Sequence, residues 1–273
     1  MKTLLAFIGT ACIHFSLYGQ SLPPFIGSRS LALGTTTACL QDEWSLFNNP
    51  AGLSGIKHTT AAFTYEAVPD FSPFNRTAAL IAAPSSYGTF GFGMYRFGDD
   101  LYNEQIARAG FSNRFGLASL GVTANYVQYN VAGFGRKGFF TVGFGGMAML
   151  TPELTIGAHI HNIYQPKINE GEKERLPTVM VAGAGYKAAT NVFITAEVQK
   201  DLHNPGVWKA GVEYEPHPKA IFRTGFNLKP SAGFIGFGLR PKKFLLDYSY
   251  AYYMTIGAKH QATVGYRFKK SKK

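Results

Sequence analysis

From about residue 56 to residue 268 the chain consists of segments of about ten residues in which apolar residues alternate with small or polar ones. In the last segment, residues 259–268, Val264 and Tyr266 fall on one face and Thr263 and Gly265 on the other. A period of two places alternate side chains on opposite faces of a β-strand. Soluble sheets use strands of about five or six residues, whereas a tilted strand needs about nine to eleven to cross a bilayer. The pattern therefore predicts membrane-spanning strands.

About fourteen such segments occur, and an even number of antiparallel strands is typical of a closed outer-membrane barrel. Short connections alternate with longer ones along the chain, as expected when turns gather at one end of a barrel and loops at the other. The predicted fold is all-β, a transmembrane antiparallel β-barrel of about 14 strands. The strands are expected at residues 56–66, 74–83, 87–97, 104–112, 116–129, 136–150, 153–164, 177–187, 191–200, 206–215, 219–229, 232–240, 243–253 and 259–268.

The composition agrees with this fold and excludes several others. Charged residues make up 16% of the chain, compared with about 25% in typical soluble domains. A mean hydropathy of -0.03 is too low for a bundle of membrane helices. The net charge of +11 comes from scattered basic residues without a nucleic-acid-binding signature, so no nucleic-acid partner is expected. A soluble secreted β-sandwich stays open as an alternative, although the Gly- and Ala-rich second face suits water poorly.

Both ends of the chain carry signals for export and membrane insertion. Residues 1–20 combine a basic Lys2, an apolar stretch and a small Gly19 before the expected cut, the layout of a cleaved signal peptide. Tyr266 and Phe268 place aromatic residues at the end of the last strand, as in many outer-membrane barrels, and a basic tail follows at residues 269–273. We therefore expect Sec-dependent export to the bacterial outer membrane, periplasmic N- and C-termini, and lipid or lipopolysaccharide around the wall.

Residues 21–55 precede the first strand and lack the alternation. A barrel of fourteen strands encloses a lumen that the side chains of its wall do not fill. We therefore expect residues 21–55 to fold into the lumen as a hatch and residues 56–268 to form the barrel.

The hatch segment carries a set of residues that resembles a known family. Its members are Arg29, Leu33, Gly34, the acidic pair Asp42 and Glu43, and the run Asn49, Pro50, Ala51 and Gly52. This arrangement resembles the N-terminal hatch of the FadL-like outer-membrane proteins and is most similar to the PorV/PorQ family of Bacteroidetes. The resemblance implies a fourteen-stranded barrel that is plugged by its N-terminal hatch.

The resemblance implies two functions. In PorV-like proteins the barrel is an accessory that binds partner proteins of the type IX secretion system, and this is the function expected first. In FadL-like transporters, movement of the hatch or of a kinked wall strand opens a lateral route for hydrophobic small molecules. An apolar pocket continuous with a gap near the first three strands would favour uptake, and a sealed lumen with an exposed apolar rim would favour partner binding.

The alternation also assigns polar side chains to the lumen. Because both signs of charge occur, we expect internal ion pairs that hold the hatch to the wall, with Arg29 and the pair Asp42 and Glu43 as the partners from the hatch, and a polar solute path as the alternative. His159 and His161 share a face but have no third ligand nearby in sequence, so no metal site is expected. No ordered catalytic motif occurs, which indicates a non-enzymatic protein without cofactors. The lumen-facing residues are His159, His161, Glu197, Lys209, Glu213, Arg223, Asp247 and Arg267.

Aromatic residues near the strand ends are expected to form the girdles that anchor a barrel at both membrane surfaces. This set comprises Tyr65, Phe71, Phe74, Tyr95, Phe97, Tyr102, Tyr126, Tyr129, Tyr164, Trp208, Tyr214, Tyr248, Tyr252 and Tyr253.

Overall fold

The computed structural model describes residues 25–69, 71–166, 175–201 and 205–269. The expected signal peptide at residues 1–20 and most of the basic tail lie outside these ranges. No helix within them is long and apolar enough to cross a membrane.

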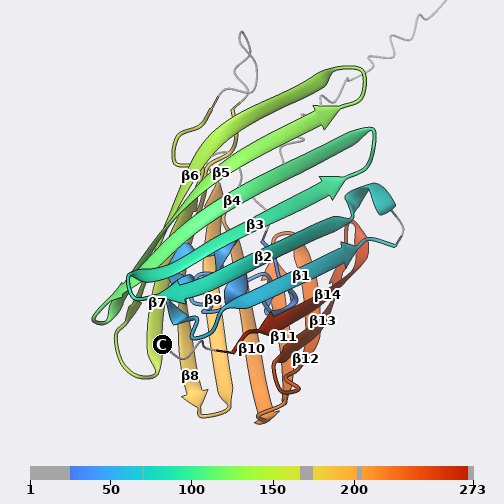
Figure 1. Ribbon diagram of the computed structural model, residues 1–273. Helices are drawn as coiled ribbons and strands as arrows, with labels where there is room; N and C mark the ends of the chain where they lie inside the picture. The colour runs from blue at the N-terminus through green and yellow to red at the C-terminus, as the bar shows by residue number, and fades with distance from the viewer. Residues whose placement is uncertain (1–24, 70, 167–174, 202–204, 270–273) are drawn as a thin grey trace, which may run out of the picture.

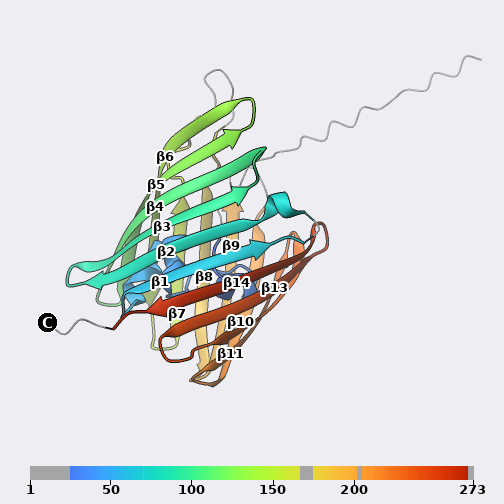
Figure 2. The same cartoon turned by 45° about the vertical axis from the view of Figure 1, so that its right-hand side comes forward.

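Fourteen antiparallel strands close into a barrel in which β1 pairs with both β2 and β14 (Figure 1). Figure 2 turns the β1–β14 pair toward the viewer. The predicted fold class is confirmed, and each expected segment coincides with one strand to within about four residues. The strands are β1 (Thr60–Ala67), β2 (Arg76–Ser85), β3 (Gly88–Gly98), β4 (Tyr102–Phe115), β5 (Ala118–Val131), β6 (Gly135–Met149), β7 (Leu154–His161), β8 (Val179–Ala189), β9 (Val192–Asp201), β10 (Val207–His217), β11 (Ala220–Leu228), β12 (Ser231–Leu239), β13 (Phe244–Tyr253) and β14 (Gly257–Arg267).

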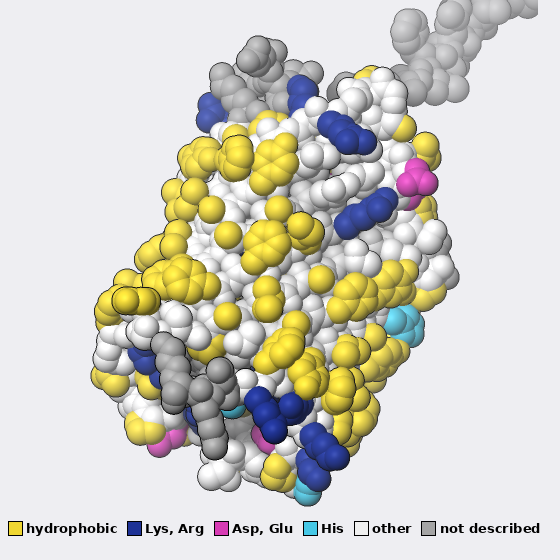
Figure 3. Space-filling model, in the orientation of Figure 1, with side chains coloured by type: hydrophobic (Ala, Val, Ile, Leu, Met, Phe, Trp, Pro, Cys, Tyr) yellow, Lys and Arg dark blue, Asp and Glu magenta, His cyan; other side chains and the backbone are white. Residues whose placement is uncertain are grey.

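The two faces of the wall differ as the alternation requires. Phe63, Ile81 and Phe92 point outward and are about half exposed, and Figure 3 shows apolar side chains spread over the outer wall. Thr64 and Leu80 on the same strands point inward and are buried. The core therefore lies inside one closed sheet. The alternative of a β-sandwich is wrong, because that fold requires two sheets packed face to face.

Residues 25–56, which we call the hatch, lie inside the barrel (Figure 1, blue). They contain α1 (Ser28–Ala32), η1 (Glu43–Leu46) and η2 (Pro50–Gly55), and a further short helix, η3 (Ser72–Phe74), lies between β1 and β2. The N–H of Asp42 donates to Ser45 Oγ (3.2 Å) as part of a capping box. At η2, Asn49 Oδ1 accepts from the N–H of Ala51 (3.1 Å), and Pro50 occupies the first turn.

Glycines on the inner wall allow the hatch backbone to approach closely. A Cβ on Gly225 of β11 would lie 2.2 Å from the backbone nitrogen of Gly34, and one on Gly157 of β7 would lie 2.1 Å from the carbonyl oxygen of Ala38. No real Cβ tolerates such distances. The glycine-rich inner face therefore serves to seat the hatch.

Candidate functional site

A chain of ion pairs fastens the hatch to one side of the wall. Arg29 of α1 donates from Nε and Nη2 to both carboxylate oxygens of Glu213 on β10, at 2.8 Å each, and from Nη1 to Asp42 (3.2 Å). Arg223 on β11 then bridges Glu213 and Asp247, both at 2.6 Å. Arg240 also contacts Asp247, at 2.9 Å. Two-point contacts between a guanidinium and a carboxylate are strong and directional, so this network fixes the orientation of α1.

A second group of contacts centres on Glu197 of β9. Its Oε2 accepts hydrogen bonds from the backbone N–H groups of Thr37 (2.6 Å) and Ala38 (2.8 Å). Its Oε1 lies 3.3 Å from Lys209 Nζ, which also donates to the carbonyl oxygen of Thr35 (3.2 Å). A carboxylate and an ammonium of the wall thus bind the hatch backbone directly. The structure brings together all of the expected lumen residues from Glu197 to Asp247, in two groups.

Arg267 and the acidic pair lie at the end of the barrel where β1 begins and β14 ends, which we call the terminus end. A polar cavity of about 460 Å³ opens there and is lined by Asp42, Glu43 and Arg267 among others. Asp42 pairs with Arg29 of the hatch itself, and no described ion pair involves Glu43. Burial, reinforced by the charge of Asp42, raises the pKa of Glu43 to about 7.

The remaining motif residues pack against the wall or inside the hatch. Leu33 is fully buried, and Gly34 adopts φ +72, where a Cβ would lie 2.8 Å from the carbonyl oxygens of Ala210 and Phe226. Asn49 Nδ2 donates to the carbonyl oxygens of Ala38 (2.7 Å) and Gly146 (3.2 Å).

The Ala51 carbonyl accepts from Ser112 Oγ on β4 at 3.1 Å. Gly52 is packed so tightly that a Cβ would lie 2.2 Å from the Leu40 carbonyl oxygen. At the C-terminus, the rings of Tyr266 and Phe268 are 5.0 Å apart, and the Phe268 N–H donates to Thr59 (2.8 Å) beside the first strand.

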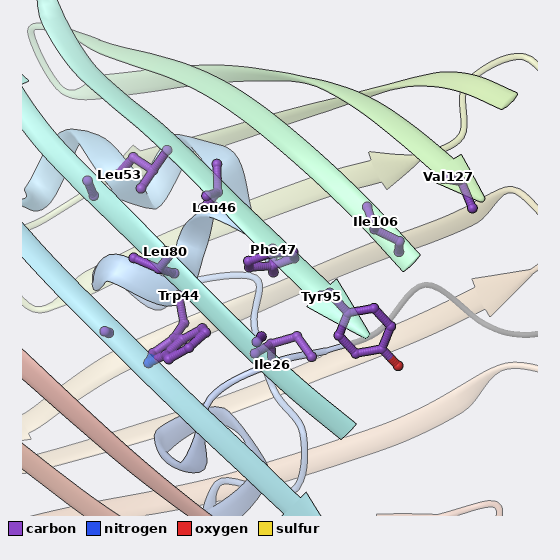
Figure 4. Packing of buried hydrophobic residues seen from close by; sticks show 12 residues of the cluster. Ile26, Trp44, Leu46, Phe47, Leu53, Leu80, Tyr95, Ile106 and Val127 are labelled. Atoms are coloured by element: carbon purple, nitrogen blue, oxygen red, sulfur yellow. The ribbon is translucent and has the colours of Figure 1, made fainter. Parts of the chain in front are cut away.

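Apolar packing also joins the hatch to the wall. The inner faces of β1 to β5 pack on the hatch in one buried cluster, in which Trp44, Leu46 and Phe47 of the hatch meet Leu80 and Ile106 of the wall (Figure 4). Arg108 of β4 donates to the Phe47 carbonyl (2.8 Å) and lies over the Phe47 ring. On this side the hatch is therefore held by apolar packing together with Arg108.

A line of aromatic rings follows the lumen at the other end of the barrel, the loop end. The ring centroids of successive members are 4.6, 5.9, 6.4, 6.5 and 6.3 Å apart. Such separations are those of interacting aromatic pairs. We call this line the aromatic ladder; it runs from the β1–β2 loop to β6 through Phe71, Phe74, Phe97, Tyr102, Tyr129 and Phe139.

The ladder corrects part of the expected aromatic girdle. Tyr95 is buried in the inner cluster, Phe97 and Tyr129 pack against it, and Tyr253 packs on a second inner cluster, so these four rings do not face lipid. Their position near strand ends did not predict which face they lie on, because alternate residues of a strand point to opposite faces and the face is therefore set by whether a residue number is odd or even. Tyr95 and Phe97 share the parity of Gly91, which faces the hatch, and this sequence signal would have identified them.

Among the described strands the shortest run of paired residues lies between β6 and β7, and not near the first three strands, where pairing is continuous. β6 pairs with β7 only from Phe144 to Met149, because β7 ends at His161 instead of the expected residue 164. Asn162 adopts a positive φ of 56, which ends the extended conformation. Above this point, the described chain crosses to β6 by one backbone bond, from Ile163 N–H to the Val142 carbonyl (3.1 Å), and by Tyr164 Oη to the Phe140 carbonyl. We call this boundary the seam.

An apolar groove of about 840 Å³ lies on the outer wall directly below the seam. Small residues of β6 to β8 form its floor and larger apolar residues its sides. The outward-facing residues that line it include Leu120, Phe144, Gly146, Ile156, Ala158, Ile160, Met180, Ala182 and Val198.

Within the described ranges no group of three or more His, Cys, Asp or Glu side chains could hold a metal ion. Burial, together with the charge of Glu197, raises the pKa of the Cys39 thiol to about 12.

Comparison with known proteins shows a shared fold. No protein-family profile matches the chain. No curated protein sequence matches it. Among solved structures, the toluene transporter TbuX of Ralstonia pickettii is similar with a TM-score of 0.70 and 14% identity, covering 89% of this chain and 98% of that one. The toluene transporter TodX of P. putida is similar with a TM-score of 0.70 and 11% identity, covering 90% and 99%. The CymD monoaromatic hydrocarbon channel has a TM-score of 0.70 and 12% identity, covering 90% and 98%.

These neighbours agree with a FadL-like barrel architecture. They give no support to the PorV/PorQ branch or to type IX secretion, so that first expectation is not carried further.

Proposed function

We propose that the protein is a non-enzymatic outer-membrane barrel through which hydrophobic aromatic small molecules diffuse. The observation that carries this proposal is the aromatic ladder, which starts at a loop and ends on β6, the strand that borders the seam. The shared fold with proteins described as toluene transporters and a monoaromatic hydrocarbon channel supports it.

The route follows from the arrangement of apolar surfaces. A solute stacks on the half-exposed rings of Phe71 and Phe74 at the loop end and moves along the ladder to Phe139. The hatch closes the lumen below, because ion pairs and apolar packing both hold it to the wall. The solute therefore leaves sideways across the seam into the outer groove, where Phe144 and Ile160 receive it.

The seam is the step at which the route can be blocked. Opening it at this level requires the loss of the Ile163–Val142 backbone bond and of the bond from Tyr164 to the Phe140 carbonyl, whereas β5 and β6 are paired along their whole shared length. A net cost of about 1 kcal/mol for each hydrogen bond is compatible with thermal opening. No energy source is needed for such passage.

A reversible disulfide across the seam tests the route. We would introduce Val142→Cys and Ile163→Cys in a chain with both native cysteines replaced, and measure uptake of radiolabelled toluene by cells whose outer membrane contains the barrel. Oxidation is expected to lower uptake by at least about tenfold, and reduction to restore it, because opening the seam costs more than 1.4 kcal/mol once it is bridged. The control is Tyr65→Cys with Thr77→Cys, a facing pair on β1 and β2. Equal uptake in oxidised and reduced seam variants contradicts the route.

The role of the ladder can be tested with two tyrosines of one strand, of which only one belongs to the ladder. Tyr129 points into the lumen from β5, whereas Tyr126 points outward and is 40% exposed. Tyr129→Ala is expected to lower toluene uptake about fivefold, since an aromatic contact contributes about 1 kcal/mol. Tyr126→Ala should leave uptake unchanged. Equal effects of the two substitutions would remove the ladder from the route.

A further inference from the structure

The ring of Phe25, at the start of the hatch, packs between hatch and wall, and we call the space that this ring fills the pocket. It meets the imidazoles of His159 and His161 edge to face, with ring centroids 6.4 and 6.5 Å away. Lys209 Nζ lies 4.2 Å from its centroid, which is a cation–π contact. A buried apolar cluster of Ala38, Cys39, Val179 and Val181 packs against it. Two imidazole rings, an ammonium group and apolar side chains thus surround a single aromatic ring.

The two imidazoles of this pocket carry polar atoms without partners. His159 and His161 are only 4% and 2% exposed. His159 Nε2 contacts Thr37 Oγ1 (3.0 Å), but His159 Nδ1 and both nitrogens of His161 make no hydrogen bond. Buried polar groups are nearly always hydrogen bonded, because each one that is not costs about 1–3 kcal/mol. Three such atoms around one ring indicate that a polar substituent belongs there.

We propose that this pocket is a binding site for a single aromatic ring that carries one hydroxyl group, and that the Phe25 ring occupies it in the absence of that ligand. The inference rests on the proposed function and narrows its substrate class from aromatic hydrocarbons to phenol-like compounds at this site. Phe25 stands in for the ring of the ligand but offers nothing to the imidazole nitrogens.

A hydroxyl group suits these nitrogens better than a carboxylate does. A neutral imidazole has one donor and one acceptor nitrogen, and a hydroxyl both donates and accepts. The charged groups around the pocket are Lys209 and Glu197, which are paired at 3.3 Å, and Arg108, whose charge acts on both imidazoles and which donates to the carbonyl oxygens of Leu46 and Phe47. A second carboxylate would be repelled by Glu197, and it has no proton to donate to the acceptor nitrogen of an imidazole.

Phe25 can leave the pocket without unseating the hatch. Hydrogen bonds between described residues begin at the next position, where the N–H and carbonyl of Ile26 both bond the Asn48 side chain at 3.0 and 2.9 Å. The ion pairs of Arg29 lie further along the chain. The described hydrogen bonds and ion pairs that hold the hatch therefore do not include Phe25.

Three matched ligands test the proposal: toluene, 4-methylphenol and 4-methylbenzoate differ only in the substituent opposite the methyl group. Binding to the full-length barrel in detergent is measured by calorimetry for the native chain, Phe25→Ala and Phe25→Ala with His161→Phe. Phe25→Ala is expected to bind 4-methylphenol at least about tenfold more tightly than the native chain does, because the competing ring is gone. The preference for 4-methylphenol over toluene should disappear when His161→Phe is added. Phe193→Ala, which removes another ring packed on the same cluster, is the control and should not tighten binding.

Unchanged affinity in Phe25→Ala, or equal affinity for toluene and 4-methylphenol, overturns the proposal. Tight binding of 4-methylbenzoate overturns the choice of a hydroxyl. Heat-modifiable gel mobility verifies that each barrel is folded, and His161→Leu replaces His161→Phe if the larger ring prevents folding. If these binding results are not obtained while the disulfide across the seam still blocks toluene uptake, only this site is refuted. If the disulfide across the seam does not block toluene uptake, the proposed function is refuted.

Discussion

Replacing Arg29 by methionine is expected to loosen the hatch while leaving the barrel wall intact. Methionine keeps an apolar stem and removes the guanidinium that joins Glu213 and Asp42. Breaking a buried ion pair by removing one partner costs about 3–5 kcal/mol. The lower end, about 3 kcal/mol, applies because the Arg29 side chain is 23% exposed and Glu213 keeps its contact with Arg223. The undocked fraction of the hatch should rise about 150-fold.

The chain has two tryptophans that report on the two parts separately. Trp44 is buried in η1 of the hatch, and Trp208 points outward from β10. Urea titrations of the barrel in detergent would follow Trp44 fluorescence in a Trp208→Phe chain and Trp208 fluorescence in a Trp44→Phe chain. Arg29→Met should move the Trp44 transition to lower urea by the equivalent of about 3 kcal/mol and leave the Trp208 transition in place.

Two comparisons make the result decisive. A double-mutant cycle with Glu213→Gln should give a coupling of about 2 kcal/mol between Arg29 and Glu213, within the range for directly bonded groups. Arg96→Met removes the exposed pair of Arg96 with Asp100 and should change neither transition. The reasoning is refuted if Arg29→Met shifts both tryptophan transitions equally or if the coupling is close to zero.

Three further predictions concern the hatch. Gly225→Ala places a Cβ 2.2 Å from the hatch backbone and should destabilise hatch docking by at least about 2 kcal/mol in the Trp44 titration, whereas Gly233→Ala, with nothing within 4 Å, should have no such effect. Because burial and the charge of Asp42 raise the pKa of Glu43 from 4.5 to about 7, its contribution to docking should be complete below pH 4.5 and disappear as the pH rises through 7; Glu43→Gln should flatten this dependence, and an unchanged profile would contradict the assignment. In a Cys12→Ser chain, Cys39 should react with iodoacetamide at pH 8 much more slowly than a free thiol, since burial raises its pKa to about 12; rapid labelling would show that the hatch does not stay docked.

The strands could be predicted because their pattern is local. Val264 and Thr263 lie on opposite faces of β14 because successive side chains alternate along any strand. The thickness of the bilayer sets a similar length for every strand. The exception is informative: the expected strand 153–164 ends at His161, since Asn162 leaves the extended conformation. A positive φ at one residue leaves no periodic signal, and the seam depends on it.

The candidate site was visible only in part. The parity of Glu213 and Arg223 assigned both side chains to the lumen, but Arg29, which pairs with Glu213, lies 184 residues away from it in sequence. Asp42, expected to meet the wall, pairs with Arg29 instead. The aromatic ladder was missed because its rings come from separate elements, and five of the six were assigned to the girdle by their position near strand ends while Phe139 was not singled out.

The sequence by itself determined the fold class, the approximate strands and which face of each strand is apolar, because period-two alternation is written into neighbouring residues. Only the tertiary structure decided which charges meet, where the wall is weakly joined, and that Phe25 lies against His159 and His161. These features depend on how a closed barrel and its hatch bring distant segments together. Closure is a property of the whole ring, so no single segment encodes it.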